Sequence, residues 1–293
     1  MKDKGRLFTL LYIPLLVGFT VFLLMDTFVI GRVYQQEVPS ATAPEATSSA
    51  PVITDHSYQD DNVRITLTEY REHNTAVYVA DIRLSSPGSL KTALAQGSYG
   101  RNIKQKTSEM AAQNNAILAV NGDYYGARDK GYVLRNGTLY RKDSSDRQAL
   151  VIDNAGAFRI VEEQAVSAEA LLDGGAQQVL SFGPGLITDG QIRVDPNTEV
   201  DQASQSNPRT AIAEVSPLHY LMVVSDGRTE RSEGLTLYEL AEFLQKQGAQ
   251  TAYNLDGGGS STMWFNGKVV NEPVNHGSKI SERRVSDIVY IGA

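Results

Sequence analysis

The chain has 293 residues, a formal net charge of −7 and no cysteine. Its length fits one large domain or two small ones. The acidic balance argues against a general nucleic-acid binder, and the lack of cysteine excludes disulfides and thiolate metal sites. We therefore expect no nucleic-acid partner, and any anionic ligand must be held by a local arrangement of donors.

The first predicted element is a membrane-spanning helix. Residues 7–25 carry no charged side chain, and a run of this length can cross a bilayer. Three basic residues lie within residues 1–6, and after Arg32 none occurs before Arg64. This bias places the N-terminal tail in the cytoplasm and the rest of the chain outside. A cleaved signal peptide is the alternative, but the apolar run is longer than a usual signal-peptide core, so we favour an uncleaved anchor over residues 7–30.

A stalk and a globular domain are predicted to follow the anchor. Residues 31–57 are rich in proline, serine, threonine and alanine, a composition typical of an extended linker. The folded domain is expected over residues 58–293. A cysteine-free exported protein fits a bacterial cell surface, so we expect a single-pass membrane protein with an extracellular domain.

The beginning of the domain is predicted to be mostly β-structure. Residues 63–70 and 75–84 nearly alternate apolar and polar positions and are rich in β-branched residues, as half-buried strands are. Residues 104–115 predict a helix that leads into a strand over 116–125. Further along, Asn-Gly and Asp-Gly pairs recur at short intervals, which indicates a series of hairpins.

One later helix is strongly marked. Thr236 and Glu239 form a capping box, an apolar stripe follows, and Gly248 supplies a stop. This helix leads directly into the strand before a glycine-rich loop. Together the patterns predict an α+β fold, a mixed, mostly short-stranded β-sheet domain with a few packed helices, preceded by one transmembrane helix.

The glycine-rich loop DGGGSST begins at Asp256 and is the main candidate site. Three adjacent glycines cost backbone entropy but allow a ligand to approach bare amides. The Walker, dinucleotide-binding and nucleophile-elbow patterns all require a lysine or a glycine that this loop lacks. Successive amides in such turns form anion-binding concavities. The predicted phosphate-binding groups are the amides and hydroxyls of Gly257, Gly258, Gly259, Ser260, Ser261 and Thr262, with Asp256 acting on a neighbouring atom such as an anomeric carbon.

A second loop of similar pattern follows the strand that begins at residue 116. In AVNGDYY, Asn121 and Asp123 stand at the strand end. Two strand-end loops of the same kind could face one cleft, although repeated turn chemistry is common in hairpin proteins.

Four further polar residues are candidates for ligand contact. Arg209 stands at the entry of an apolar strand in NPRTAIAEV, Asp226 ends the strand of LMVVSDGR, and Arg283 precedes the final strand. His276 lies in a polar loop after the glycine-rich segment. The alternative for each is a solvated surface charge or an ordinary turn.

Taken together, these motifs resemble the phosphodiester glycosidase family. AVNGDYY, NPRTAIA, VVSDGR, the helix and loop that end in NLDGGGSSTMW, and the terminal ERRVSDIVYIG occur in family order from about Ala116 to the end. Ala213 and Arg284 depart from residues that are frequent in relatives. Neither departure removes a candidate functional group.

The resemblance implies hydrolysis of a sugar-1-phosphodiester at the sugar side, with extracellular, cell-wall or exopolysaccharide glycans as the substrate class. It implies Asp256 as the catalytic carboxylate, with Asp123 and Asp226 as alternatives. The implied phosphate- and sugar-binding residues are Asn121, Arg209, Arg283 and the loop donors from Gly257 to Thr262.

Two questions stay open at this point. The three aspartates could hold a hard cation such as Ca²⁺ through oxygen ligands, but no spacing demands one, so we expect no metal and no cofactor. The alternative function is a non-catalytic, membrane-anchored binder of anionic cell-surface glycopolymers. Tyr124, Tyr125 and Trp264 would be its aromatic platforms.

Overall fold

The computed structural model describes residues 2–37, 50–200, 206–275 and 279–292. The described chain is mostly β-structure with few helices, which confirms the predicted fold class. Every strand pairing among these residues is antiparallel, whereas we expected mixed directions. Antiparallel pairing is required where a short hairpin joins two strands, as between residues 63–72 and 75–84, because parallel strands need long crossovers.

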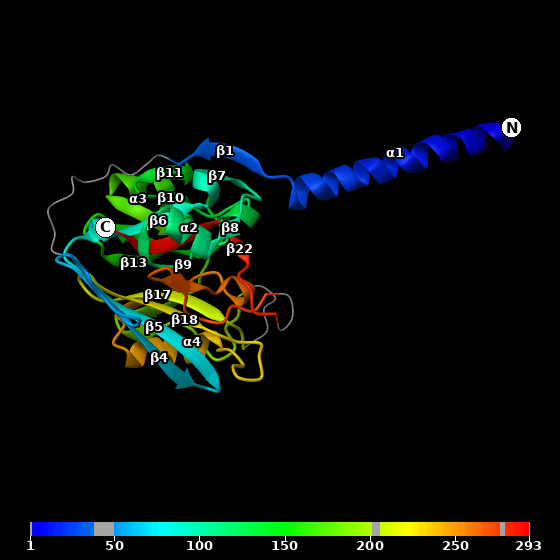
Figure 1. Cartoon of the computed structure of the whole chain (residues 1–293). Helices are drawn as coiled ribbons and strands as arrows, with labels where there is room; N and C mark the ends of the chain where they lie inside the picture. The colour runs from blue at the N-terminus through cyan, green and yellow to red at the C-terminus, as the bar shows by residue number, and fades with distance from the viewer. Residues whose placement is uncertain (1, 38–49, 201–205, 276–278, 293) are drawn as a thin grey trace.

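The largest sheet has nine strands within the described residues and forms one side of the globular body (Figure 1). In spatial order they are β16 (Gln191–Ile192), β15 (Gly185–Thr188), β19 (Thr251–Asn254), β17 (Arg209–Ser216), β18 (His219–Ser225), β5 (Thr75–Leu84), β4 (Val63–Glu72), β3 (Ser57–Gln59) and β2 (Val52–Ile53).

Two five-stranded sheets lie opposite it in the described part of the chain. One runs β21 (Lys268–Val269), β20 (Met263–Phe265), β9 (Ala116–Asn121), β23 (Asp287–Gly292) and β6 (Leu90–Leu94). The other runs β11 (Thr138–Arg141), β10 (Val133–Arg135), β14 (Ala176–Leu180), β12 (Gln148–Asp153) and β13 (Phe158–Glu162). Two-stranded ribbons pair β1 (Arg32–Gln36) with β7 (Ser98–Arg101) and β8 (Gln105–Lys106) with β22 (Arg284–Val285).

The helices cover the outer faces of these sheets. Helix α4 (Leu237–Lys246) packs on β15, β16 and β19, α2 (Thr107–Gln113) on β9, β20 and β23, and α3 (Ala168–Asp173) on β11 and β14. The predicted capping box of α4 is present, since Glu239 N donates to Thr236 Oγ1 at 3.1 Å and Thr236 N donates to Glu239 Oε2 at 2.8 Å. The 3₁₀ turns are η1 (Pro87–Ser89), η2 (Ala95–Gly97), η3 (Tyr125–Ala127), η4 (Glu163–Ala165) and η5 (Gly258–Ser260).

The main core lies between the nine-stranded sheet and the two five-stranded sheets. Strand β9 is buried along its whole length because both of its faces are covered. Leu118 and Val120 belong to the main core, whereas the intervening Ala119 packs with Met110 of α2. This two-residue alternation is the geometry of a strand buried on two sides. It fixes β9 at the centre of the molecule, and its C-terminal end carries Asn121.

Helix α1 (Lys2–Phe28) projects from the globular body (Figure 1). Within it, Leu10–Phe28 is long and apolar enough to cross a membrane, and it is the one such helix in the described residues. The segment after it differs from the expected stalk. Arg32–Gln36 forms β1, paired antiparallel with β7, so the chain docks on the domain soon after the helix ends. Part of the expected stalk, residues 38–49, lies outside the described residues.

Candidate active site

The glycine-rich loop is fastened to the loop that follows β9. Asn121 donates from Nδ2 to the carbonyl oxygen of Asp256 at 2.6 Å, and its Oδ1 accepts from Thr262 N at 3.2 Å and from Thr210 Oγ1 at 2.8 Å. Asp256 N in turn donates to the carbonyl of Gly122 at 3.2 Å. The two strand-end loops predicted to share one cleft therefore contact each other, and Asn121 fixes the start and the end of the glycine-rich loop.

The glycines make room for two arginines. A Cβ atom on Gly258 would lie 2.9 Å from Nη2 of Arg228, and a Cβ atom on Gly259 would lie 2.7 Å from Nη2 of Arg283. Gly258 also has φ +61°, in the left-handed region that favours glycine. Any larger residue at these positions would displace a guanidinium group. The loop thus presents a bare surface on which the two arginines lie.

The loop forms one wall of a cavity of about 240 Å³. Among the described residues, Asp256 is the acidic side chain that lines it. Three arginines and two aromatic residues also contribute to the lining. The residues that define this active-site cavity are Asp256, Arg209, Arg228, Arg283, Tyr124 and Phe182.

The arginines lie close enough to influence one another. Arg209 is 4% exposed, and its Nε donates to the carbonyl of Leu235 at 2.9 Å. Burial, reinforced by the charge of Arg228, lowers the pKa of Arg209 to about 10. Burial and the charge of Arg283 likewise lower the pKa of Arg228. Grouped positive charges of this kind favour an anionic ligand, and arginine can bind a phosphate with two parallel hydrogen bonds.

Asp256 is a half-buried carboxyl group among these positive charges. Burial raises its pKa to about 6, although the Ser260 hydroxyl and the charges of Arg283 and Arg128 act in the opposite direction. Such a group is mostly ionised at neutral pH and still basic enough to accept a proton. A perturbed carboxyl in a cavity is the usual property of a catalytic acid or base.

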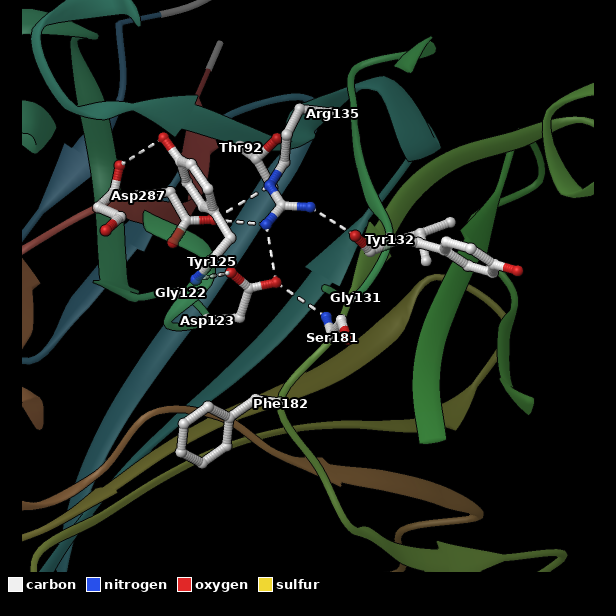
Figure 2. Close-up of polar contacts among 12 residues, drawn as sticks. Thr92, Gly122, Asp123, Tyr125, Gly131, Tyr132, Arg135, Ser181, Phe182 and Asp287 are labelled. Atoms are coloured by element: carbon white, nitrogen blue, oxygen red, sulfur yellow. Dashed lines mark hydrogen bonds and ion pairs between the residues drawn. The ribbon is translucent and has the colours of Figure 1, made fainter. Parts of the chain in front are cut away.

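Asp123 does not line the active-site cavity. It is fully buried, and its Oδ2 bonds to Arg135 Nη2 at 2.9 Å and to Ser181 N at 2.8 Å. Arg135 lies between Asp123 and Asp287 (Figure 2), with Nη2 2.8 Å from Asp287 Oδ2. This buried ion network holds Ser181, whose neighbour Phe182 lines the cavity. The geometry therefore gives Asp123 a positioning role.

Asp226 is also turned away from the cavity. Its Oδ1 accepts from Asn271 Nδ2 at 3.1 Å and from Glu272 N at 3.0 Å, and Tyr78 donates to its Oδ2 at 3.3 Å. Burial raises its pKa above the ordinary range. Of the three candidate carboxylates, the structure thus brings Asp256 alone to the cavity.

The predicted loop donors are used differently from what the sequence suggested. Gly258 N donates to Pro208 O at 2.8 Å, Ser260 N to Gly257 O at 3.2 Å and Ser261 N to Gly258 O at 3.2 Å. These amides therefore stabilise the loop. The hydroxyl groups of Ser260, Ser261 and Thr262 are buried. Charged arginine side chains surround the cavity in their place.

Two charged residues at the site were missed from the sequence. The guanidinium carbon of Arg128 lies 4.7 Å from the ring centroid of Phe182 and 5.9 Å from that of Tyr124. Arg228 lies in a segment that reads as an ordinary turn, and its φ of +61° is unusual for arginine. Both arginines contact site residues that are distant in sequence. For Arg128, its position in the loop after Asp123 was the one sequence signal that it could belong to the site.

Trp264, a predicted aromatic platform, does not line the active-site cavity. Trp264 is 8% exposed and packs in the cluster that includes Met110. His276 lies outside the described residues. Within the described ranges, the structure contains no group of three or more His, Cys, Asp or Glu side chains that could hold a metal ion. Independence from metals and cofactors stays a prediction.

The two strand-end loops predicted from the motifs lie together in the structure. Comparison with protein families then identifies the family of the chain. Residues 114–292 match the model of the phosphodiester glycosidase family. The chain belongs to this family, as the resemblance predicted. The matched segment contains all of the predicted site residues, from Asn121 to Arg283.

Individual relatives are more distant. The chain is 36% identical over 111 residues to the human N-acetylglucosamine-1-phosphodiester alpha-N-acetylglucosaminidase, which covers 34% of this chain and 21% of that protein. It is 28% identical over 181 residues to the SPbeta prophage-derived uncharacterized protein YomE of Bacillus subtilis, which covers 59% of this chain and 28% of that protein. The chain therefore spans less than a third of the length of these curated relatives.

Solved structures show the same fold. The auto-inhibited catalytic domain of the zebrafish N-acetylglucosamine-1-phosphodiester alpha-N-acetylglucosaminidase aligns with a TM-score of 0.62 at 18% identity, covering 90% of this chain and 89% of that chain. A hypothetical protein from Synechocystis aligns with a TM-score of 0.61 at 14% identity, covering 79% and 62%.

Proposed function

We propose that the domain hydrolyses a sugar-1-phosphodiester at the bond between the anomeric carbon and the phosphate oxygen. The observation that carries this proposal is the active-site cavity itself, in which a carboxyl group with a pKa of about 6 stands among arginines. Family membership supports the reaction type. The name of the human relative supports an N-acetylglucosamine-1-phosphodiester as the first substrate to test.

The proposed reaction assigns the arginines to the leaving group. Water attacks the anomeric carbon, the carbon–oxygen bond breaks, and the bonding electron pair leaves with the phosphate. A phosphomonoester has a second pKa near about 6, so it leaves without a strong general acid. Arg209, Arg228 and Arg283 would stabilise the charge that grows on its oxygens, because fixed donors act most strongly where charge develops.

Asp256 is assigned to the sugar side of the same bond. As a carboxylate it would accept the proton of the attacking water or stabilise the positive charge that develops at the anomeric carbon. The proton ends on Asp256 or in solvent, and the products are a free sugar and a phosphomonoester. Asn121 would hold the Asp256 backbone in place through the bonds described above.

The cellular context belongs to the same proposal. Helix α1 would anchor the chain in a membrane with the N-terminus inside, and the domain would act on phosphorylated glycans of the cell surface. The apolar span Leu10–Phe28 and the basic residues before it support this topology.

The test is the position of bond cleavage. The protein is incubated with an α-N-acetylglucosamine-1-phosphodiester in oxygen-18 water, and mass spectrometry locates the label. Attack at the anomeric carbon puts the label on the sugar, and label on the phosphate would refute the assignment. Asp256→Asn should lower kcat by roughly 10²-fold or more, whereas Asp189→Asn, at a surface turn, should not. Binding without turnover across a panel of diesters would favour the glycopolymer-binding alternative.

A further inference from the structure

A second cavity lies beside the β1–β7 ribbon and has a volume of about 330 Å³. Four tyrosines and several charged side chains line it, and no sequence motif had indicated it. Its aromatic residues are Tyr34, Tyr99, Tyr125 and Tyr140. Its size lies in the range of small-ligand pockets.

The membrane-proximal strand completes this cavity. The β1–β7 register shifts between Val33 and Gln35, which makes Tyr34 the bulged residue of β1. A bulge of this kind re-aims a side chain, and the Tyr34 ring lies 5.9 Å from the Tyr99 ring, centroid to centroid. A Cβ atom on Gly100 would lie 1.9 Å from the carbonyl oxygen of Arg32. The glycine therefore allows the close strand contact that brings Tyr34 to the cavity.

The tyrosines form an ordered aromatic surface. The ring of Tyr99 stacks on that of Tyr125 at 5.5 Å and 25°, and the ring of Tyr140 lies 5.4 Å from Tyr99. Tyr125 is 1% exposed and donates its hydroxyl to Ser286 O at 3.3 Å. Tyr34, by contrast, is 60% exposed. A ligand would thus contact the buried, stacked rings of Tyr99 and Tyr125 at the floor of the cavity and the exposed ring of Tyr34 at its side. This arrangement suits the apolar face of a sugar ring.

The charged groups of the cavity offer donors and acceptors together. Arg101 pairs with Asp129 at 3.1 Å. Arg141 donates to the backbone carbonyls of four residues, Tyr125, Arg128, Lys130 and Gly131, which fixes its position. Asp129 and Asp143 add carboxylates to the lining. Basic side chains outnumber these carboxylates in the lining, since Arg101, Arg128, Arg141 and Lys142 all contribute to it. Mixed donors and acceptors match the hydroxyl groups of a sugar, and the lipid comparison in the test below separates a sugar from an anionic headgroup.

Arg128 lies between this cavity and residues of the active-site cavity. It lines the tyrosine cavity directly. Its guanidinium group also lies over Phe182 and near Tyr124, which both line the active-site cavity. Its charge lowers the pKa of Asp256, so it is electrostatically in range of the catalytic carboxyl. A chain-like ligand that occupied both cavities would therefore have to cross Arg128.

We propose that the tyrosine cavity is a second sugar-binding subsite, which holds a sugar unit beyond the cleaved diester and makes the preferred substrate an extended glycan. This inference rests on the proposed function. It assigns Tyr34, from the strand next to the membrane helix, to substrate selection.

The test compares short and extended substrates on the full-length protein in phosphatidylcholine nanodiscs. The minimal probe is methyl α-N-acetylglucosaminyl phosphodiester. Two further probes carry an added disaccharide, one on the phosphate side and one on the sugar side. Tyr34→Ala should lower kcat/KM roughly tenfold for an extended probe and less than about twofold for the minimal one, on the scale of one aromatic contact. Tyr34→Trp should retain the preference, and Tyr238→Ala, on α4, is the matched control.

Three outcomes would overturn the subsite. They are an equal loss on the short and extended probes, no loss on either extended probe, and an effect of Tyr34→Ala confined to nanodiscs that contain phosphatidylglycerol, which would identify a lipid headgroup as the occupant. Saturation-transfer NMR with the Asp256→Asn protein measures binding of the extended probes without turnover. If wild-type protein cleaves no diester but Tyr34→Ala abolishes this binding, the proposed reaction fails and the subsite stands.

Discussion

At the scale of single residues, burial disfavours the charged form of Asp256 and of two arginines in the site. The arginines also disfavour one another's charge. Burial raises the pKa of Asp256 to about 6 and lowers that of Arg209 to about 10. In both groups burial disfavours the ionised form. A phosphodiester, singly negative, would relieve the repulsion among the arginines while leaving Asp256 near the sugar. The electrostatics therefore favour an anionic ligand beside the arginines.

The first prediction is a pH dependence that belongs to Asp256. Because its pKa is raised to about 6 and the proposed mechanism uses the carboxylate, kcat/KM should rise with pH through about 6 and then level off. Below that pH the group is protonated and cannot accept a proton. Steady-state rates between pH 4.5 and 8.5 measure this rising limb of the pH–rate profile. Asp256→Asn should remove the limb along with most of the rate, and a residual rate that kept the same limb would assign the titration to another group.

Gly259 provides a steric probe of Arg283. A Cβ atom there would lie 2.7 Å from the guanidinium, and the residue's φ lies outside the left-handed region, so alanine fits the backbone. Gly259→Ala should displace Arg283 and raise KM by roughly tenfold, the scale of one charge-assisted bond of about 1.4 kcal/mol. The melting temperature should change little, because the long side chain can move.

Gly88→Ala is the control for this substitution, since the nearest atom to its Cβ would be 3.7 Å away. Kinetics and thermal melts of both variants make the comparison. Unchanged KM for Gly259→Ala would mean that Arg283 does not contact the substrate in its present position.

At the scale of elements, what the sequence predicted well was local. The capping box at Thr236 and the alternation in residues 75–84 depend on neighbours in the chain, and both elements are present. The loop after Asp256 was recognised by its composition. The docking of β1 could not be predicted, because it depends on contacts with β7 far away in sequence. The contact of Arg128 with Phe182 is equally distant in sequence, and the place of Arg128 in the loop after Asp123 gave only a weak signal. The five residues of β1 were not recognised as a strand, because the sequence that follows them is rich in Pro, Ser and Ala.

Strand β1 gives the next prediction. Gly100→Val would put a Cβ atom 1.9 Å from the Arg32 carbonyl oxygen, and both partners are backbone, so neither can move away cheaply. We expect β1 to detach while the remaining domain stays folded. Hydrogen exchange of residues 32–36 should accelerate to the rate of an unprotected segment. Ser98→Ala removes a side-chain bond to Gln36 in the same ribbon and should leave the protection largely intact; equal protection in Gly100→Val would contradict the docking.

At the scale of the whole molecule, the anchor and the domain are joined closely. Helix α1 ends at Phe28, β1 begins at Arg32, and Asn102 Nδ2 donates to the carbonyl of Thr27 at 2.9 Å. The domain therefore starts next to the end of the apolar helix. If α1 spans a membrane, the tyrosine cavity lies near its surface, because the chain from Phe28 to Tyr34 can reach at most about 20 Å. Under the proposed function, the substrate would be a glycan close to the membrane.

The last prediction is the orientation that this arrangement requires. Because the chain contains no cysteine, single cysteines report topology without background. Asp3→Cys keeps the basic residues that bias the N-terminus inward, and Lys246→Cys lies on the exposed end of α4. A membrane-impermeant maleimide added to intact cells should label Lys246→Cys but not Asp3→Cys. Asp3→Cys should be labelled only after the membrane is opened. The reverse pattern would place the domain in the cytoplasm, where a cell-surface glycan could not reach the arginines. Labelling of Lys246→Cys in the medium, on a chain that has lost its N-terminus, would show that α1 is a cleaved signal.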